Sequence, residues 1–287
     1  MTAPLLSVVI PTWNRAHLVG EAVASALAQR PRAVEVIVVD DDSTDGTREL
    51  LRERFGATIT VLQMPERRGP GAARNAGVRM ATGELLAFLD SDDLWLPGKL
   101  DAELRTFERF LDAEAVITDS LAFTESRPDD ATRFVHNGLF AATGGVARPL
   151  AECRWPWTDS RNGVATCSIT VRRDALSRLG DAPLFAEDLA WCEDWEFEMR
   201  IYHGCRVVVL PEVWSHVRRF DDGTRLGRAV PGQPATREQE LGLLRARLRV
   251  VERSQWLEGL DPYLAGELAR FRADTVRQLA AYAEGDA

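Results

Sequence analysis

The stretch Val34–Thr47, VEVIVVDDDSTDGT, places an apolar run, an acidic turn and a helix start one after another. The run through Val39 contains a single charged residue, which is typical of a strand buried on both faces of a sheet. Asp40 ends the run, and the Ser-Thr-Asp sequence at 43–45 favours the N-cap of a helix. The sequence therefore predicts a buried strand, a polar turn and a helix over residues 47–55.

The same order of strand and helix recurs on both sides of this stretch. Short apolar runs predict further strands, and helical spacing or turn residues predict helices between them. The predicted strands are 7–10, 34–39, 59–62 and 85–89, and the predicted helices are 16–29, 47–55 and 71–81. Pro11 is expected to stop the first strand. This alternation predicts an α/β fold with a mostly parallel sheet covered on both faces, in which ligands bind beyond the carboxyl ends of the strands.

Strand and helix signals are weaker after residue 100. Further strands are expected at 115–118, 167–172 and 206–210, helices at 174–179 and 194–202, and loops over 126–149. After Pro234 the strand signals end, and two helical apolar stripes follow on either side of Gly259 and Pro262. We expect one domain over 1–228, divided near residue 100, and a helical hairpin over 235–287 packed on it. A partner-binding or membrane-surface role for these helices is the alternative.

The composition argues against several classes of protein. The 287 residues carry a formal net charge of -9, so non-specific binding to nucleic acid is unfavourable because the two partners repel each other. The four cysteines form no CxxC pair, and no secretory signal or membrane-spanning run is found, so we expect reduced thiols in a cytoplasm. Arginine is abundant while Lys99 is the only lysine, which indicates a bacterial genome rich in G and C.

Two acidic clusters follow predicted strands. The Asp-Ser-Asp-Asp sequence at 90–93 crowds three carboxylates, whose repulsion requires a cation or exposure to water. Such hard oxygen ligands suit Mg²⁺ or Mn²⁺, which in turn bind phosphates. The carboxylates at 40–42 are placed to accept hydrogen bonds from a nucleobase or a ribose. The alternatives are a solvated acidic turn at 90–93 and helix capping at 40–42.

Glycine motifs for phosphate binding are missing from the expected places. Pro11–Arg15 follows the first strand, where a GxGxxG motif would stand, and no GxxxxGK[ST] motif occurs. The segment 69–77, GPGAARNAG, instead places Arg74 and Asn75 on an early turn of a helix. Arg74 is therefore a candidate for contact with a diphosphate, and a surface ion pair is the alternative.

Together these segments resemble the family 2 inverting glycosyltransferases of the GT-A fold. The matching pieces are SVVIPTWNR, VEVIVVDDDSTDGT, GPGAARNAG and GELLAFLDSDDLWLPGKL, with looser matches at CSITVRRDAL, WCEDWEFEMRI and CRVVVLPEVWSHVRR. The resemblance covers residues 5–225 and implies a GT-A, Rossmann-like fold with a nucleotide-binding half (1–100) and an acceptor-binding half (101–228). It implies sugar transfer of the hexosyltransferase type from a nucleoside-diphosphate sugar to a hydroxyl group, with inversion at the anomeric carbon.

The resemblance also implies the roles of individual residues. It places Pro11, Thr12, Asn14, Arg15, Asp40, Asp41, Arg74, Asp90 and Ser91 at the nucleotide. It assigns a divalent metal, Mn²⁺ or Mg²⁺, to Asp92, with Asp90 and His216 as further candidates, and the donor or acceptor sugar to Trp191, Glu193 and Trp195. Asp194 would be the general base that takes the proton of the attacking hydroxyl. The metal would offset the charge that develops on the leaving diphosphate.

Four places depart from the family pattern or have a structural alternative. Asp42 stands where the family has a turn glycine, although Asp tolerates a left-handed backbone better than most residues. The family's Arg-Arg-His reads Arg-Arg-Phe at 218–220, where the arginines are candidates for phosphate contact or form a solvated basic edge. His216 is either a substitute for the missing histidine or a half-buried residue. Helix capping is the alternative for the pair at 193–194.

The implied partners are a nucleoside-diphosphate sugar, with UDP favoured, and a glycan, lipid-linked or small-molecule acceptor. Acceptor specificity is expected from residues 126–161 and from the C-terminal helices, and Trp155 and Trp157 are interpreted as core or loop anchors. Peripheral contact with the inner membrane face and homo-oligomers through the C-terminal helices are left open. The alternative functions are a non-catalytic nucleotide-sugar-binding scaffold and a sugar-phosphate nucleotidyltransferase, whose usual Gly-rich loop is missing here.

Overall fold

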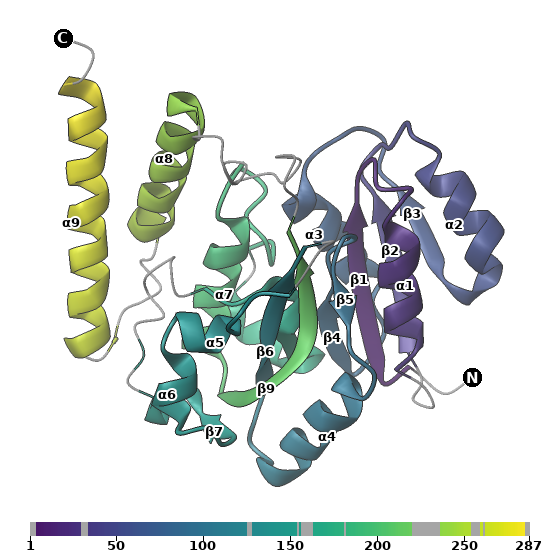
Figure 1. Ribbon diagram of the computed structural model, residues 1–287, viewed down its shortest axis with the longest axis horizontal. Coiled ribbons are helices and arrows are strands. Elements are labelled where there is room, and N and C mark those ends of the chain that lie inside the picture. Colours follow the sequence, from purple (N-terminus) through teal and green to yellow (C-terminus); the bar gives the residue numbers. More distant parts are fainter. Residues whose placement is uncertain are drawn as a thin grey trace.

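A mixed sheet flanked by helices forms the body of the molecule, and two C-terminal helices stand beside it (Figure 1). The computed structural model describes residues 4–29, 34–124, 128–153, 155, 163–180, 182–219, 236–253, 259–260 and 262–284. The predicted α/β class with a helical C-terminal part is confirmed.

The sheet formed by the described residues runs in the order β3-β2-β1-β4-β8-β6-β9-β5, with β7 paired to β9. The strands are β1 (Leu6–Thr12), β2 (Val34–Asp40), β3 (Thr60–Gln63), β4 (Leu85–Phe88), β5 (Leu94–Trp95), β6 (Ala115–Phe123), β7 (Arg148–Pro149), β8 (Ile169–Arg172) and β9 (Val207–Arg218). The strands β1 to β4 pair in parallel, as expected, whereas β8 is antiparallel to both β4 and β6. The parallel strands bring their carboxyl ends, with the acidic clusters after β2 and β4, to one edge of the sheet.

Pro11 does not end β1, contrary to the expectation. The strand continues to Thr12, and Pro11 pairs with Val39 of β2. On its other side, β1 pairs with β4 only as far as Val9 and Phe88. Pro11 therefore has one side without a strand partner, and a residue that lacks an N–H is tolerated at such an edge position.

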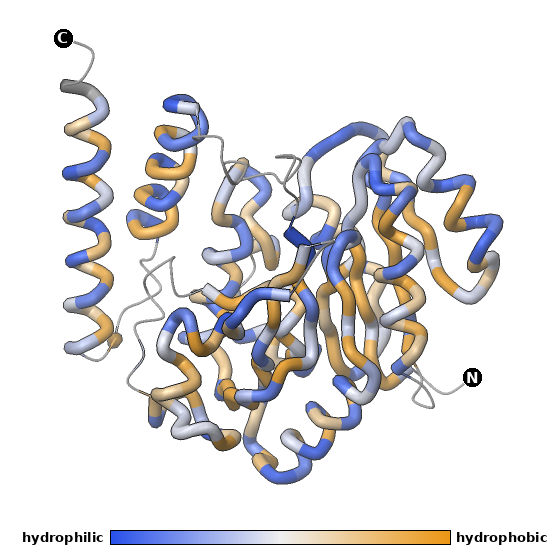
Figure 2. Tube along the Cα trace, viewed as in Figure 1, coloured by the Kyte–Doolittle hydropathy of each residue, from blue (hydrophilic) through white to orange (hydrophobic). Residues whose placement is uncertain are grey.

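Helices cover both faces of the sheet. The α-helices are α1 (Val19–Leu27), α2 (Thr47–Phe55), α3 (Pro70–Met80), α4 (Lys99–Arg109), α5 (Arg133–His136), α6 (Leu139–Thr143), α7 (Glu193–Gly204), α8 (Arg237–Arg253) and α9 (Pro262–Glu284). One buried cluster, around Val23, Leu51 and Phe107, packs α1, α2 and α4 on the sheet. The other, around Ala73 and Phe197, packs α3 and α7 on the opposite face. Figure 2 shows the central strands as apolar stretches between these helices.

The region after residue 100 differs from the prediction in three places. Residues 173–179 form a 3-10 turn, η5 (Arg173–Leu179), because Gly180 with φ 83° ends the segment before an α-helix can extend. The last strand continues past Leu210 to Arg218, since it pairs with β6 through a bulge. Two short helices, α5 and α6, lie where loops were expected. Helices of one turn are too short to leave a periodic signal in the sequence.

The C-terminal helices α8 and α9 confirm the predicted pair, and α9 begins at Pro262. Val250 of α8 and Phe271 of α9 are buried in the same cluster as α3 and α7, so the pair packs on the main body. The predicted domain boundary between residues 228 and 235 lies outside the described residues. Within the described part of the chain, none of the helices combines the length and the apolar character needed to cross a membrane.

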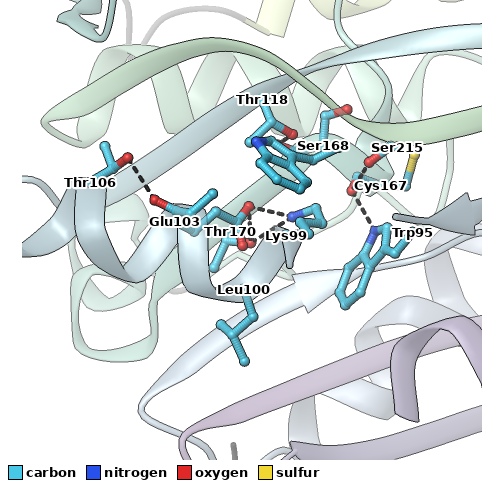
Figure 3. A network of polar contacts seen from close by, with 12 residues as sticks. Trp95, Lys99, Leu100, Glu103, Thr106, Thr118, Cys167, Ser168, Thr170 and Ser215 are labelled. Carbon is cyan, nitrogen blue, oxygen red and sulfur yellow. Dashed lines mark hydrogen bonds and ion pairs between the residues drawn. The ribbon is translucent and has the colours of Figure 1, made fainter. Parts of the chain in front are cut away.

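The single lysine of the chain is buried within a polar network that joins α4 to β8 (Figure 3). Lys99 and Glu103 form an ion pair one helical turn apart, and both are at most 1% exposed. The Thr170 hydroxyl donates to Glu103 Oε1 at 3.0 Å and accepts from Lys99 Nζ at 3.4 Å. Burial raises the pKa of Glu103, and the ammonium group of Lys99 opposes this rise. Each charge of the pair therefore depends on the other for its stability.

Lys99→Met is expected to lower the free energy of unfolding by about 3–5 kcal/mol, because Glu103 is left buried without a cation. The double substitution Lys99→Met/Glu103→Met is expected to cost less than Lys99→Met alone, since an apolar pair has no charge to desolvate. Urea denaturation of the three proteins measures both differences. A loss below about 1 kcal/mol for Lys99→Met, or a double variant less stable than the single one, would contradict this account.

Candidate active site

A cavity of about 800 Å³ opens where the carboxyl ends of β1, β2 and β4 meet the N-terminus of α7. Most of the site residues predicted from the sequence line it, namely Pro11, Thr12, Arg15, Asp41, Arg74, Asp90, Ser91, Asp92, Trp191, Glu193, Asp194 and Trp195. Asn14, Asp40 and His216 are not among the described residues that line the cavity. The fold thus brings together two groups of residues that lie about a hundred positions apart in the sequence.

The loop after β1 is held by Asn14, which lies behind the cavity wall. Asn14 has a left-handed φ of 49°, and its backbone N–H donates to Ser43 Oγ at 2.9 Å. Its side-chain oxygen accepts from the backbone N–H of Thr44 at 2.8 Å. Asn14 therefore ties the loop after β1 to the loop after β2, and this link positions Thr12 and Arg15 at the cavity.

The three consecutive aspartates after β2 have different environments. Asp40 is fully buried, where its Oδ2 accepts from the backbone N–H of Ser43 at 3.2 Å and from Arg48 at 2.9 Å. Asp41 lines the cavity, and its two oxygens accept from the backbone N–H groups of residues 68 and 69 at 2.7 and 2.8 Å. A carboxylate retains lone pairs for further donors after two such bonds. Asp42 adopts the left-handed backbone, with φ 64°, that its place in the turn requires.

Arg74 of α3 joins the end of β4 to the start of α7. Its Nη2 lies 2.7 Å from Asp90 Oδ1 at the end of β4, and its Nη1 lies 3.1 Å from Glu193 Oε1 at the start of α7. Gly77 allows α3 to pack this close to β1, because a Cβ at that position would lie 2.4 Å from Val9 Cγ1. The sequence predicts that Arg74 contacts a diphosphate. In the structure its guanidinium also forms ion pairs with two carboxylates of the protein, Asp90 and Glu193.

The ion pairs of Arg74 with Asp90 and Glu193 affect the pKa values of Arg74 and Glu193. Burial works against the charge of Arg74, but Asp90 and Glu193 more than offset this effect and raise the pKa of the guanidinium. Burial raises the pKa of Glu193 to about 7, the neighbouring Asp194 carboxylate adds to the rise, and Arg74 opposes it. Glu193 is therefore a carboxyl group that exchanges its proton near neutral pH.

The acidic turn after β4 is closed by backbone contacts. The backbone N–H of Asp93 donates to the carbonyl of Asp90 at 3.0 Å. Arg218 of β9 donates its backbone N–H to Asp93 Oδ1 at 2.9 Å and its Nε to the carbonyl of Asp92 at 3.1 Å. Arg218 also pairs with Glu21 at 2.7 Å, so this arginine supports the turn. The turn presents Asp90, Ser91 and Asp92 to the cavity.

The two other basic residues predicted near the phosphates have different positions. His216 lies on β9 beside Leu94 of β5, with its ring 5.7 Å from the ring of Phe123, and burial lowers its pKa. Arg219 lines the cavity and forms an ion pair with Asp129 at 2.9 Å. Residue 220 lies outside the described residues.

The N-terminus of α7 presents the acidic pair to the cavity. Cys192 precedes the helix with a left-handed φ of 65°, which turns the chain sharply into the first helical residue. Glu193 is buried against Arg74, whereas Asp194 is exposed at the cavity. Asp194 Oδ1 accepts from the backbone N–H of Trp195 at 2.8 Å, which orients the carboxylate.

The tryptophans near this pair have different surroundings. Trp191 is half-buried and lines the cavity. Trp195 is 4% exposed and packs edge-on against Phe271 of α9, with 5.3 Å between ring centroids, so it helps to dock the C-terminal helix. Trp155 is buried and donates its Nε1–H to the carbonyl of Asn137 at 2.9 Å. Trp157 lies outside the described residues, as do residues 126–127, 154, 156 and 158–161 of the region expected to set specificity.

Several cavity residues were not named individually by the sequence analysis, although it expected acceptor specificity from residues 126–161 and from the C-terminal helices. They include Trp13 and Arg67, Asp130, Arg133 and His136, Glu198 of α7, and Leu243 and Arg247 of α8. Arg67 stacks on Trp13, with its Cζ 3.5 Å from the ring centroid. Glu198 stands one helical turn after Asp194, so helical spacing was a signal that could have found it. Nothing local in the sequence indicates that α8 reaches this cavity.

The raised pKa of Glu193 predicts how stability depends on pH. A carboxyl group that binds its proton more tightly when folded contributes most below its unfolded pKa of 4.5, and this contribution is lost as pH rises towards about 7. Between pH 5 and pH 8 we expect the free energy of unfolding of the wild type to fall by roughly 2–3 kcal/mol relative to Glu193→Gln. Chemical denaturation across this pH range measures the difference. Glu53→Gln, at an exposed site on α2, is the control, and parallel curves for Glu193→Gln and the wild type would exclude the raised pKa.

The comparisons with known proteins agree with this geometry. Residues 7–133 match the family model described as glycosyl transferase family 2. The chain is 37% identical over 135 residues to the putative teichuronic acid biosynthesis glycosyltransferase TuaG of Bacillus subtilis, a match that covers 46% of this chain and 53% of TuaG. It is 36% identical over 100 residues to the UDP-Glc:alpha-D-GlcNAc-diphosphoundecaprenol beta-1,3-glucosyltransferase WfgD of Escherichia coli, covering 35% of this chain and 40% of WfgD. The matched stretch thus spans about half the length of these curated relatives or less.

Solved structures share the fold over most of the chain. Residues 1–349 of TarS from S. aureus, in complex with UDP-GlcNAc, align with a TM-score of 0.65 and 24% identity over 93% of this chain and 71% of that one. The mannosyltransferase PcManGT from Pyrobaculum calidifontis, in complex with GDP-Man and Mn²⁺, aligns with a TM-score of 0.66 and 21% identity over 99% of this chain and 74% of that one. Residues 7–133 of this chain therefore match the model of glycosyl transferase family 2, and the chain shares its fold with these glycosyltransferase structures.

Proposed function

We propose that this chain is an inverting glycosyltransferase that moves a sugar from a nucleoside-diphosphate sugar to a hydroxyl group of a glycan, lipid-linked or small-molecule acceptor. The observation that carries the proposal is the single cavity that joins the carboxyl ends of β1, β2 and β4 to the exposed Asp194 of α7. One part of this cavity has the backbone and carboxylate groups that suit a nucleotide, and the other has a base. A UDP-sugar is the favoured donor, in line with the UDP-Glc in the name of WfgD.

The donor is proposed to bind at the edge of the sheet. Open α/β sheets bind ligands beyond the carboxyl ends of their strands, which is where Thr12, Asp41 and Asp90 lie. Asp41 is fixed by two backbone N–H groups and is available to accept from the base of the nucleotide. Trp13 and Arg67 lie at the same part of the cavity as a stacked pair that covers it.

The carboxylates of the β4 turn fit a divalent metal that also binds the donor. In the described part of the chain, no three His, Cys, Asp or Glu residues are grouped closely enough to hold a metal ion by themselves. Mg²⁺ and similar hard cations are commonly held by one or two carboxylates together with substrate phosphates, and Asp90 and Asp92 provide such a pair. When bound, the metal would offset the negative charge on the leaving diphosphate. His216 is away from the cavity, so the proposed ligands are the two aspartates.

Asp194 is proposed as the general base. Its exposed carboxylate is oriented by the backbone N–H of Trp195 and can accept the proton of an acceptor hydroxyl. Glu193 is instead buried and bound to Arg74, and its pKa is raised to about 7. The proposed division is therefore that Glu193 holds the start of α7 in place while Asp194 faces the substrate.

Asp194→Asn is expected to leave UDP binding unchanged and to lower sugar transfer by about 10²- to 10⁴-fold, since Asn keeps the shape and the bond to Trp195 but takes up no proton. Release of UDP from UDP-glucose and UDP-N-acetylglucosamine in the presence of a panel of glycan acceptors measures the rate. Asp112→Asn is the control, because the Asp112 side chain is 79% exposed and lies outside the cavity. Near-normal turnover of Asp194→Asn, or a product with retained anomeric configuration, would refute the proposed mechanism.

Asp92→Ala is expected to abolish the part of UDP binding that depends on metal. The wild type should gain about 2.7 kcal/mol in stability from UDP with Mn²⁺ at a hundred times the dissociation constant, and much less when a chelator is present. Asp92→Ala should gain only the smaller amount of stability from UDP, both with Mn²⁺ and with chelator. Thermal unfolding with UDP, GDP and other nucleoside diphosphates measures this, with Asp112→Ala as the control. A full gain for the wild type in chelator would remove the metal from the proposal.

A further inference from the structure

Helix α8 adds a cation to the acceptor side of the cavity. Leu243 and Arg247 both line the cavity, and their spacing of four residues places them on one face of the helix. Cys192 directly precedes the acidic pair at 193–194. Burial raises the pKa of its thiol to about 12, and the positive charge of Arg247 opposes this rise. Arg247 therefore lies near the start of α7, although more than 50 residues separate it from Asp194 in the sequence.

The position of α8 is fixed by contacts on both sides of this cation. Gly242 lies against Trp191, since a Cβ at Gly242 would be 3.4 Å from the indole Nε1. One and a half turns after Arg247, Arg253 Nη1 lies 2.7 Å from Asp188 Oδ1 in the segment that leads to α7. Val250 is buried in the main hydrophobic cluster. The guanidinium is therefore presented from a helix that is anchored at the residues next to the proposed base.

Arg247 differs from Arg74, Arg133 and Arg219 of the cavity because it has no hydrogen-bond or ion-pair partner among the described residues. Arg74 binds two carboxylates, Arg219 binds Asp129, and Arg133 donates to the carbonyl of Gly163 at 2.7 Å. Arg247 has no hydrogen bond or ion pair within the described residues, and its Nε is buried without an acceptor. A buried charged donor without a partner is unfavourable, so a site that retains one favours a ligand that supplies the acceptor atoms.

We propose that Arg247 binds an anionic group, a phosphate or a carboxylate, that is carried by the acceptor. The planar guanidinium donates in pairs to such groups, which gives both affinity and a fixed orientation. The acceptor is preferred over the donor as the source of the anion because α7 lies between α8 and the strands of the proposed donor site (Figure 1). The proposal rests on the proposed glycosyltransferase function, and it makes α8 part of the acceptor site.

The test uses the full chain saturated with UDP and Mn²⁺, so that the donor phosphate site is filled. Inorganic phosphate, glucuronate and neutral glucose are titrated by calorimetry into the wild type, Arg247→Gln, Arg247→Lys and Arg245→Gln. Arg245 is exposed on the same helix and loses the same charge, so it is the matched control. We expect at least one of the two anions to bind the wild type and Arg245→Gln equally, Arg247→Gln to bind it at least tenfold more weakly, and Arg247→Lys to be intermediate. The dissociation constant of UDP should be the same in all four proteins, which also reports that each is folded.

Three outcomes would overturn the proposal. The first is a wild type that binds neither anion more tightly than glucose. The second is an equal loss in Arg245→Gln and Arg247→Gln, which would indicate long-range attraction alone. The third is weaker UDP binding in Arg247→Gln, which would place Arg247 at the donor. Failure of the proposed glycosyltransferase function is a separate result, since it would appear as a lack of UDP binding by the wild type itself.

Discussion

The buried guanidinium of Arg74 is the contact on which the geometry of the site depends. It holds Asp90, at the end of β4, and Glu193, at the start of α7, on one cation. Arginine stays charged under all ordinary conditions, so the cation persists across pH, whereas Glu193, whose pKa is raised to about 7, becomes a carboxylate only as pH rises through that value. Loss of Arg74 would leave the buried carboxyl group of Glu193 without its cation. The contact therefore links the end of β4 to the start of α7, the helix that carries the proposed base.

Arg74 pairs with one carboxylate from each of two acidic segments, the turn after β4 and the start of α7. In the β4 turn, Asp90 is bound to Arg74 while Asp92 also faces the cavity. At α7, Glu193 is bound to Arg74 while Asp194 is exposed. The pair at α7 thus divides into one member that builds the site and one that is left to meet the substrate, whereas in the β4 turn Asp90 pairs with Arg74 and also lines the cavity with Asp92, as the second proposed metal ligand. This division also explains why the raised pKa belongs to Glu193, which is buried and lies beside a second negative charge.

The sequence predicted the features that depend on local pattern. The alternating strands and helices of residues 6–88 and the two terminal helices leave signals in composition or spacing, whereas β5 and α4, at residues 94–109, were not predicted. Contacts between residues that are far apart in the sequence leave no such signal. The burial of Asp40 beside Arg48, the anchoring role of Asn14 and the placement of His216 away from the cavity are decided by how loops and strands meet. The arrival of α8 at the cavity depends on packing against Trp191, which no periodicity encodes.

The two sides of the cavity differ in how far they depend on local sequence pattern and on long-range contacts. The proposed donor side is built from strand ends with backbone groups and short acidic motifs, and it falls within the family match over residues 7–133. The proposed acceptor side takes side chains from α7 and α8, which lie beyond that match. Helices that pack on the edge of a domain can change without altering the register of the sheet, because they contribute no strand to it. On the proposed assignment, the acceptor side can therefore change without altering the donor side, and Arg247, which has no hydrogen bond or ion pair among the described residues, is the side chain proposed to bind the acceptor.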